Sequence, residues 1–72
     1  MHSAREQFAA NLRLHREKIG LSQEALADLC DLHRTEISLL ERAKRSPRLE
    51  TIVTLARGVQ LAEPGELLAG ID

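Results

Sequence analysis

Basic side chains gather in one part of this chain, between residues 34 and 48. They are Arg34, Arg42, Lys44, Arg45 and Arg48. Guanidinium and ammonium groups bind phosphate oxygens, and arginine also forms paired hydrogen bonds with O6 and N7 of guanine. The formal net charge of the 72 residues is −1, so this positive charge is a local feature. The cluster therefore predicts a surface for a polyanion, with nucleic acid as the leading candidate.

A solvated helix end is the alternative explanation of the same cations, because basic residues favour helix C-termini. Thr35 and Ser38 are likewise ordinary residues on any exposed helix. Aromatic side chains usually stack on the bases of single strands, and Phe8 is the sole aromatic residue, which favours a duplex over a single strand. From position 50 onward the charge is mostly negative, with Arg57 set against Glu50, Glu63, Glu66 and Asp72.

Hydrophobic spacing and capping residues predict five helices with short connections and no strand. Ser3 and Ser22 are suitable N-caps, and Pro64 suits the first position of the last helix. Pro47 favours an extended break, because proline pushes the preceding residue out of helical geometry. The expected helices run from Ser3 to about Lys18 and over about 23–30, 33–41, 49–59 and 64–70, with a basic loop at 43–48. The predicted fold class is all-α, a compact five-helix bundle in a single domain over residues 1–72.

The second and third helices carry the residues that a helix-turn-helix requires. Ala27 is small where the two helices would cross, and Asp31 tolerates the left-handed backbone of the turn better than most residues. Leu32 follows as the apolar residue that locks the angle, and Ile37 and Leu40 form the inward side of the third helix. This arrangement places the third helix in a DNA major groove, while flanking cations hold the phosphates.

Other classes of chemistry find little support in the sequence. A single cysteine, Cys30, permits no internal disulfide, favours a cytoplasmic location and is expected in the core. No set of His, Cys and carboxylate residues has metal-ligand spacing, so we expect neither a metal nor a cofactor. A glycine-rich phosphate loop and a nucleophile beside a base are also missing, so we do not expect an enzyme. No stretch reaches the roughly 18 to 20 apolar residues that span a membrane.

Two stretches are the most informative: LSQEALA, from Leu21, and LHRTEISLLERAKRSPRLETI, from Leu32. They resemble the Cro and phage-repressor (XRE-type) family of helix-turn-helix regulators, and the match covers roughly residues 5 to 71. The resemblance implies a bacterial or phage regulator of transcription, a repressor for instance, that binds double-stranded DNA in a sequence-specific manner. The short free-standing form resembles the small controller proteins of restriction-modification systems.

The resemblance also implies roles for individual residues. Base reading is implied for Arg34, Thr35, Glu36, Ser38 and Leu39. Phosphate binding is implied for Ser22, Gln23, His33, Arg42, Lys44, Arg45 and Arg48. A salt bridge between Arg16 and Glu41 is implied to tie the first helix to the end of the third. Ala43 stands where the family usually has glycine, so either the backbone differs there or the alanine bears strain.

The chemistry of the base-reading set is consistent with those roles. A bidentate arginine–guanine pair contributes about 1–3 kcal/mol of discrimination. Leu39 and the Thr35 methyl group can pack on thymine methyl groups. Glu36 could accept a hydrogen bond from a cytosine amine, although an unpaired carboxylate near phosphates more often selects against binding.

A homodimer is also implied, with candidate contacts at Leu61, Leu67, Leu68 and Ile71. The alternative for these side chains is that they simply close the core. Two-fold symmetry would place two recognition helices about 34 Å apart, which is the spacing of successive major grooves on a palindromic operator. RNA polymerase is a candidate further partner, and its contact with the protein decides between repression and activation.

A protein-interaction module, such as an antitoxin or an anti-regulator, is the alternative function on the same scaffold, because fold alone does not settle function. The cationic loop favours DNA. A module that binds a protein should instead present a larger exposed apolar patch.

Overall fold

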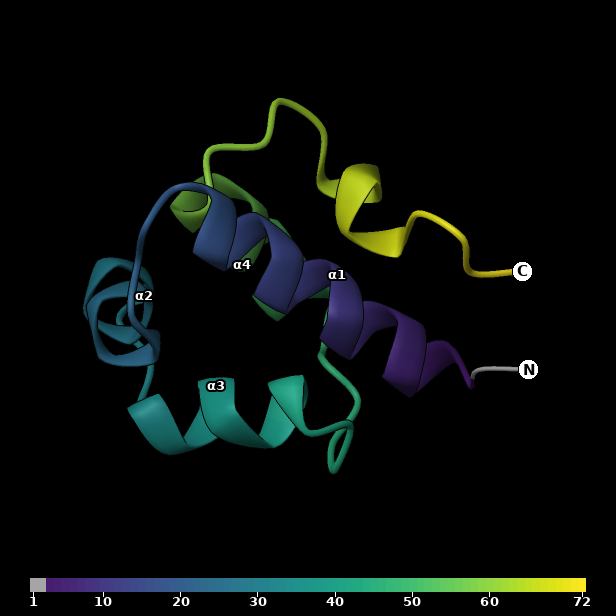
Figure 1. Ribbon diagram of the computed structural model, residues 1–72, viewed down its shortest axis with the longest axis horizontal. Coiled ribbons are helices and arrows are strands. Elements are labelled where there is room, and N and C mark those ends of the chain that lie inside the picture. The colour runs from purple at the N-terminus through teal and green to yellow at the C-terminus, as the bar shows by residue number, and fades with distance from the viewer. Residues whose placement is uncertain (1–2) are drawn as a thin grey trace.

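Four α-helices and one short 3-10 helix make up residues 3–72, which are the residues that the computed structural model describes (Figure 1). The elements are α1 (Ala4–Lys18), α2 (Gln23–Cys30), α3 (Arg34–Glu41), α4 (Leu49–Gly58) and η1 (Pro64–Leu68). No strand occurs within this range, so the all-α prediction is confirmed. The first two residues of the predicted domain lie outside the described range.

Side-chain caps explain where α1 and α2 begin. Ser3 Oγ accepts a hydrogen bond from the Glu6 backbone N–H at 3.2 Å, and Glu6 Oε1 accepts one from the Ser3 N–H at 2.9 Å. Ser22 Oγ accepts from the Ala25 N–H at 3.0 Å. Each cap satisfies an amide group that has no partner inside the helix. Both predicted N-caps are therefore present.

The turn between α2 and α3 has the geometry that a helix-turn-helix requires. Asp31 adopts the left-handed conformation, with φ 56° and ψ 42°, and the Leu32 N–H closes the end of α2 by donating to the Ala27 carbonyl at 2.9 Å. His33 is the N-cap of α3 and has an extended backbone, with ψ 143°, so the helix begins at Arg34; the His33 side chain forms no capping bond. Leu32 is half-buried against the core and fixes the direction in which α3 leaves the turn.

Every element contributes to one hydrophobic core. In Figure 1, α1 crosses α4, α2 is seen end-on beside them, and α3 lies along the lower edge. α1 packs against both α3 and η1, while α4 packs against α2 and η1. The fully buried side chains at the centre are Leu12, Leu26, Ile37, Leu40, Leu55 and Leu67. Among the described residues, no helix combines the length and apolarity that crossing a membrane demands.

The prediction of a fifth α-helix over 64–70 is wrong, because this segment is a 3-10 helix that ends at Leu68. Its hydrogen bonds run over three residues, as from the Glu66 N–H to the Glu63 carbonyl at 3.1 Å. The segment ends where the backbone of Ala69 becomes extended, with ψ 133°, which cannot continue a helix. The buried side chain of Asn11 holds this end against α1, because its Nδ2 donates to the carbonyls of Leu67 and Ala69 at 2.9 and 2.8 Å.

Candidate nucleic-acid interface

The two sides of α3 have different environments. Ile37 and Leu40 are buried in the core. The predicted base-reading residues lie on the remaining surface: Arg34 and Thr35 are exposed, and Glu36, Ser38 and Leu39 are half-buried. The helix therefore presents a polar, accessible side over its full length, which a helix must do to contact base edges in a groove.

A groove runs between the start of α3, the basic loop and the start of α4. We call it the α3–loop groove, and its volume is about 740 Å³. One wall carries Thr35, Glu36 and Leu39 of α3, and the other carries Arg45, Ser46 and Arg48 of the loop. Part of the predicted base-reading set and part of the predicted phosphate-binding set thus line the same depression.

The basic loop begins with a left-handed residue at the end of α3. Ala43 has φ 57°, and the Lys44 N–H donates to the Leu39 carbonyl at 2.9 Å. This hydrogen bond is typical of a helix C-terminus that ends with a left-handed residue. The family's glycine geometry is therefore retained, and Ala43 bears the strain. Arg42, Lys44, Arg45 and Arg48 are all exposed around this turn. Arg42 Nε lies 3.4 Å from the Ser38 carbonyl, and Arg45 pairs with Glu36.

A second depression lies at the start of α3, and two phosphate candidates, Ser22 and Gln23, line it. Arg34, which is predicted to read bases, lines it with them, so the start of α2 and the start of α3 face one another. Ser22 uses its hydroxyl oxygen to cap α2. His33 is exposed and lines the α3–loop groove instead. The predicted phosphate-binding residues therefore flank α3 on both sides.

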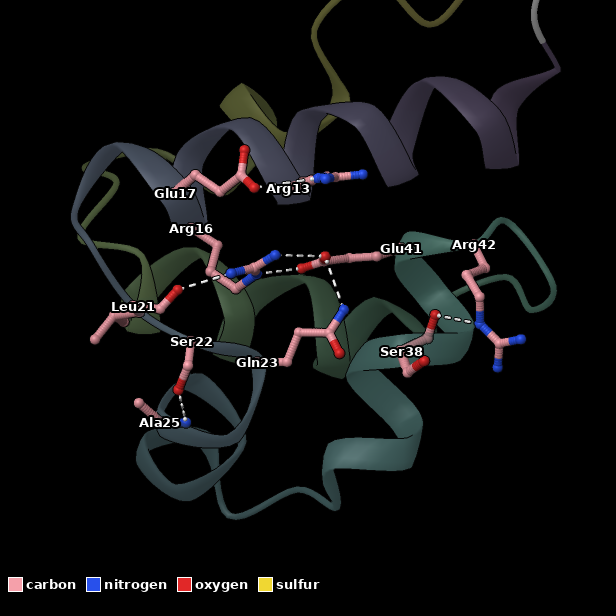
Figure 2. Close-up of polar contacts among 10 residues, drawn as sticks. All are labelled: Arg13, Arg16, Glu17, Leu21, Ser22, Gln23, Ala25, Ser38, Glu41 and Arg42. Atoms are coloured by element: carbon pink, nitrogen blue, oxygen red, sulfur yellow. Dashed lines mark hydrogen bonds and ion pairs between the residues drawn. The ribbon is translucent and has the colours of Figure 1, made fainter.

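A buried ion pair fixes α3 relative to the other helices (Figure 2). Arg16 Nε donates to Glu41 Oε2 at 2.6 Å and Arg16 Nη2 to Glu41 Oε1 at 2.9 Å, while Arg16 Nη1 donates to the Leu21 carbonyl at 2.7 Å. The side chains of Arg16 and Glu41 are only 11% and 4% exposed. The hydrogen bonds to Glu41 raise the pKa of Arg16 above its ordinary value despite the opposing effect of burial.

Gln23 joins this pair from the first position of α2. Its Nε2 donates to Glu41 Oε1 at 3.0 Å, as Figure 2 shows, so α1, α2 and α3 meet at one carboxylate. Sequence reasoning placed Gln23 at a phosphate and gave no partner within the chain. A further unforeseen contact is the ion pair of Glu36 with Arg45. Neither contact has a sequence signature, because its partners come from different elements and follow no helical period.

The four residues predicted for a dimer interface differ in their environment. Leu61 and Ile71 are half-buried against the core, and Leu68 is 39% exposed. Leu67 has no exposed surface and fills the core beneath η1. The prediction that Leu67 contacts a second copy is therefore wrong, since a side chain enclosed by its own chain cannot contact a partner without rearrangement. Leu68 is the most accessible of the four large apolar side chains.

Comparison with known proteins agrees with this geometry. The model of the helix-turn-helix family HTH_3 matches residues 12–63, and this chain belongs to that XRE-type family. Control protein C.SmaI of Serratia marcescens is 40% identical over 60 residues, which cover 83% of this chain and 71% of that protein. These matches define a protein class, the helix-turn-helix regulators, with relatives named as restriction-modification control proteins.

Solved structures agree as well. The restriction-modification controller protein C.AhdI from Aeromonas hydrophila superposes with a TM-score of 0.83 at 40% identity, covering 88% of this chain and 94% of that one. The controller protein C.Esp1396I, solved as a tetramer with its natural 35 base-pair operator, has a TM-score of 0.83 at 23% identity, covering 92% and 87%. At that identity the second match concerns the fold alone.

Proposed function

We propose that this chain is a transcription regulator that binds a specific double-stranded DNA operator, as a controller protein of a restriction-modification system. The observation that carries the proposal is the polar side of α3, which stands beside the α3–loop groove and among exposed arginine and lysine side chains. Membership of the helix-turn-helix family and 40% identity to two controller proteins support the same conclusion.

In this proposal α3 lies in the major groove. Arg34, on its first turn, reaches a base edge, and Thr35 and Leu39 contact neighbouring bases. Lys44 and Arg48 hold phosphates of the adjoining backbone. The buried Arg16–Glu41 pair supports these contacts indirectly, because it fixes the angle at which α3 leaves the bundle. Base reading requires that angle to be held within narrow limits.

The binding form that we propose is a homodimer on a palindromic operator. Exposed Leu68, with half-buried Leu61 and Ile71, lies at the C-terminal segment and supplies apolar surface that a second copy would cover. Two-fold symmetry then sets the two α3 helices about 34 Å apart, one turn of the duplex. Replacing Leu68 by Glu should convert a dimer to monomers in sedimentation, while a folded dimer that persists would exclude this surface.

The test of the function begins with selection of duplexes from a random pool, followed by titration of the selected operator and of random duplex. Arg34→Ala is expected to weaken operator binding by about 1–3 kcal/mol and to relax preference at one position of each half-site. Lys44→Ala is expected to weaken both duplexes alike and to reduce the salt dependence by about one unit of slope.

The two variants serve as matched controls, because each removes one exposed cation, from the start of α3 in one case and from the basic loop in the other. Equal effects on operator and random duplex from both variants would contradict the assigned roles. A protein that selects no sequence and ignores duplex in dilute buffer would contradict the proposed function itself. Binding of a protein partner in place of DNA would then point to an interaction module on this scaffold.

A further inference from the structure

The α3–loop groove contains one ion pair, between Glu36 on the first turn of α3 and Arg45 in the basic loop. Arg45 Nη1 donates to Glu36 Oε1. The Glu36 side chain is 24% exposed and the Arg45 side chain 54% exposed. Within residues 3–72 the other two ion pairs lie elsewhere, on the outside of α1 and at the buried end of α3.

A carboxylate at this position creates an electrostatic problem for a protein that binds DNA. Phosphates that approach Arg34, Lys44 and Arg48 also approach Glu36, and the repulsion between like charges opposes binding. Glu36 is too enclosed for its carboxylate to turn fully into water. Arg45 is the cation that compensates this charge where it lies.

The pairing leaves both partners with unused hydrogen-bonding capacity. Within residues 3–72, Arg45 is bonded through Nη1 alone, and its planar guanidinium carries five N–H donors, so donors remain for a phosphate. Glu36 uses Oε1, and no donor among the described residues binds Oε2. The Oε2 atom is therefore an acceptor without a partner on the wall of the groove.

We propose that Glu36 determines sequence specificity by accepting a hydrogen bond from the N4 amine of a cytosine, and that Arg45 is the positioning residue that makes this contact tolerable. This inference rests on the proposed function and names a chemical feature of its operator. The amine of cytosine is a major-groove donor, whereas thymine O4 and guanine O6 are acceptors that a carboxylate repels. Adenine also carries an amine, at N6, but the N7 acceptor beside it repels a carboxylate, so Glu36 favours cytosine over the other three bases.

A different arrangement would give Arg45 the opposite role. If Glu36 only occupied Arg45 in the free protein, binding would require the pair to break, and Arg45 would then gain a phosphate. Removing the Glu36 charge would make Arg45 more useful to binding in that case. In our proposal it makes Arg45 less important, because there is no charge left to compensate. The two arrangements therefore predict couplings of opposite sign.

The experiment is a double-mutant cycle of Glu36→Gln, Arg45→Ala and the double variant, titrated with the selected operator and with random duplex. Glu36→Gln is expected to bind random duplex several-fold more tightly and to lose its preference at one cytosine position. Arg45→Ala alone is expected to weaken binding to both duplexes by about five- to tenfold more than Lys44→Ala, since it exposes an uncompensated carboxylate to phosphates. In the Glu36→Gln background this additional loss should disappear.

Lys44 supplies the matched control, because it lies in the same loop and takes no part in the Glu36–Arg45 ion pair. Lys44→Ala should have the same effect with or without Glu36→Gln. Arg45→Lys, which keeps the charge, should restore most of the random-duplex affinity. Thermal melts should show every variant folded, since Glu36 and Arg45 line the groove and neither belongs to the hydrophobic core.

Additive effects in the cycle, or a larger loss from Arg45→Ala in the Glu36→Gln background, would overturn the inference. So would unchanged base preference in Glu36→Gln. These results leave the proposed function intact as long as the parent protein binds its selected operator. If the parent binds no duplex, the proposed function fails and this inference fails with it.

Discussion

Replacing Arg16 by Met should destabilise the fold more than any change in the α3–loop groove. Methionine keeps most of the apolar stem and removes the guanidinium. Two hydrogen bonds to Glu41 and one to the Leu21 carbonyl are lost. Glu41, whose side chain is 4% exposed, keeps only Gln23 as a donor. The variant therefore holds a buried carboxylate without its counter-charge.

The size of the expected loss of stability follows from the burial of Glu41. Removing one partner of a buried ion pair typically destabilises a protein by about 3–5 kcal/mol, mainly because the remaining charge is left uncompensated. Each kcal/mol lowers the midpoint of thermal unfolding of a domain this small by about 4–8 °C. We therefore expect the midpoint to fall by roughly 12–40 °C, because the lost free energy is a large part of the stability of a small domain.

The assay is thermal and urea unfolding followed by far-UV circular dichroism at neutral pH. Arg13→Met is the matched control, because Arg13 pairs with Glu17 on the same helix while the two side chains are 65% and 54% exposed. The control should change the free energy of unfolding by less than about 1 kcal/mol. High salt should leave the loss in Arg16→Met nearly unchanged, since the pair is shielded from solvent. A loss within about 1 kcal/mol of the control would refute the reasoning.

Three further changes test the backbone and the packing. Ala43→Gly should raise the free energy of unfolding by about 0.5–1 kcal/mol, because Ala43 has φ 57°, whereas Gly20→Ala, at φ 75° with open space around it, should lower it by a similar amount. Chemical unfolding measures both changes, and changes of the same sign would contradict the argument. Gly58→Ala should destabilise the fold by about 1–3 kcal/mol, because the new Cβ would lie 2.6 Å from Cys30 Sγ and 2.8 Å from Leu26 Cδ1. In thermal melts a Cys30→Ala background should relieve part of this loss, and the absence of any relief would count against the clash. Burial raises the pKa of the Cys30 thiol, so the folded state keeps this proton to higher pH than the unfolded state, and stability should be intact below the ordinary thiol pKa and fall above it. Unfolding measured across alkaline pH should show this fall in the parent protein and not in Cys30→Ala.

Local features of the fold could be predicted from the sequence because their partners are close along the chain. The caps at Ser3 and Ser22 bond to amides three residues later, and the turn at Asp31 depends on the conformation of one residue. The apolar spacing that buries Ile37 and Leu40 is equally local. These signals located α1 to α4 to within a residue or so, because each helix satisfies them without knowing where its neighbours lie.

The contacts that define the candidate site depend on how the helices are placed. The segment after Pro64 is held against α1 by Asn11, far away in the chain, which donates to the carbonyls of Leu67 and Ala69. Leu67 lies in the core because η1 packs against α1 and α4, although its spacing also suited a surface.

The sequence by itself determined the helices, the turn and the position of the cationic cluster. The tertiary structure alone decided that Glu36 meets Arg45 across the groove and that Gln23 meets Glu41 at the end of α3. Helix propensities and caps act over three or four residues, whereas these pairs form only after the core has fixed the distance and angle between separate elements.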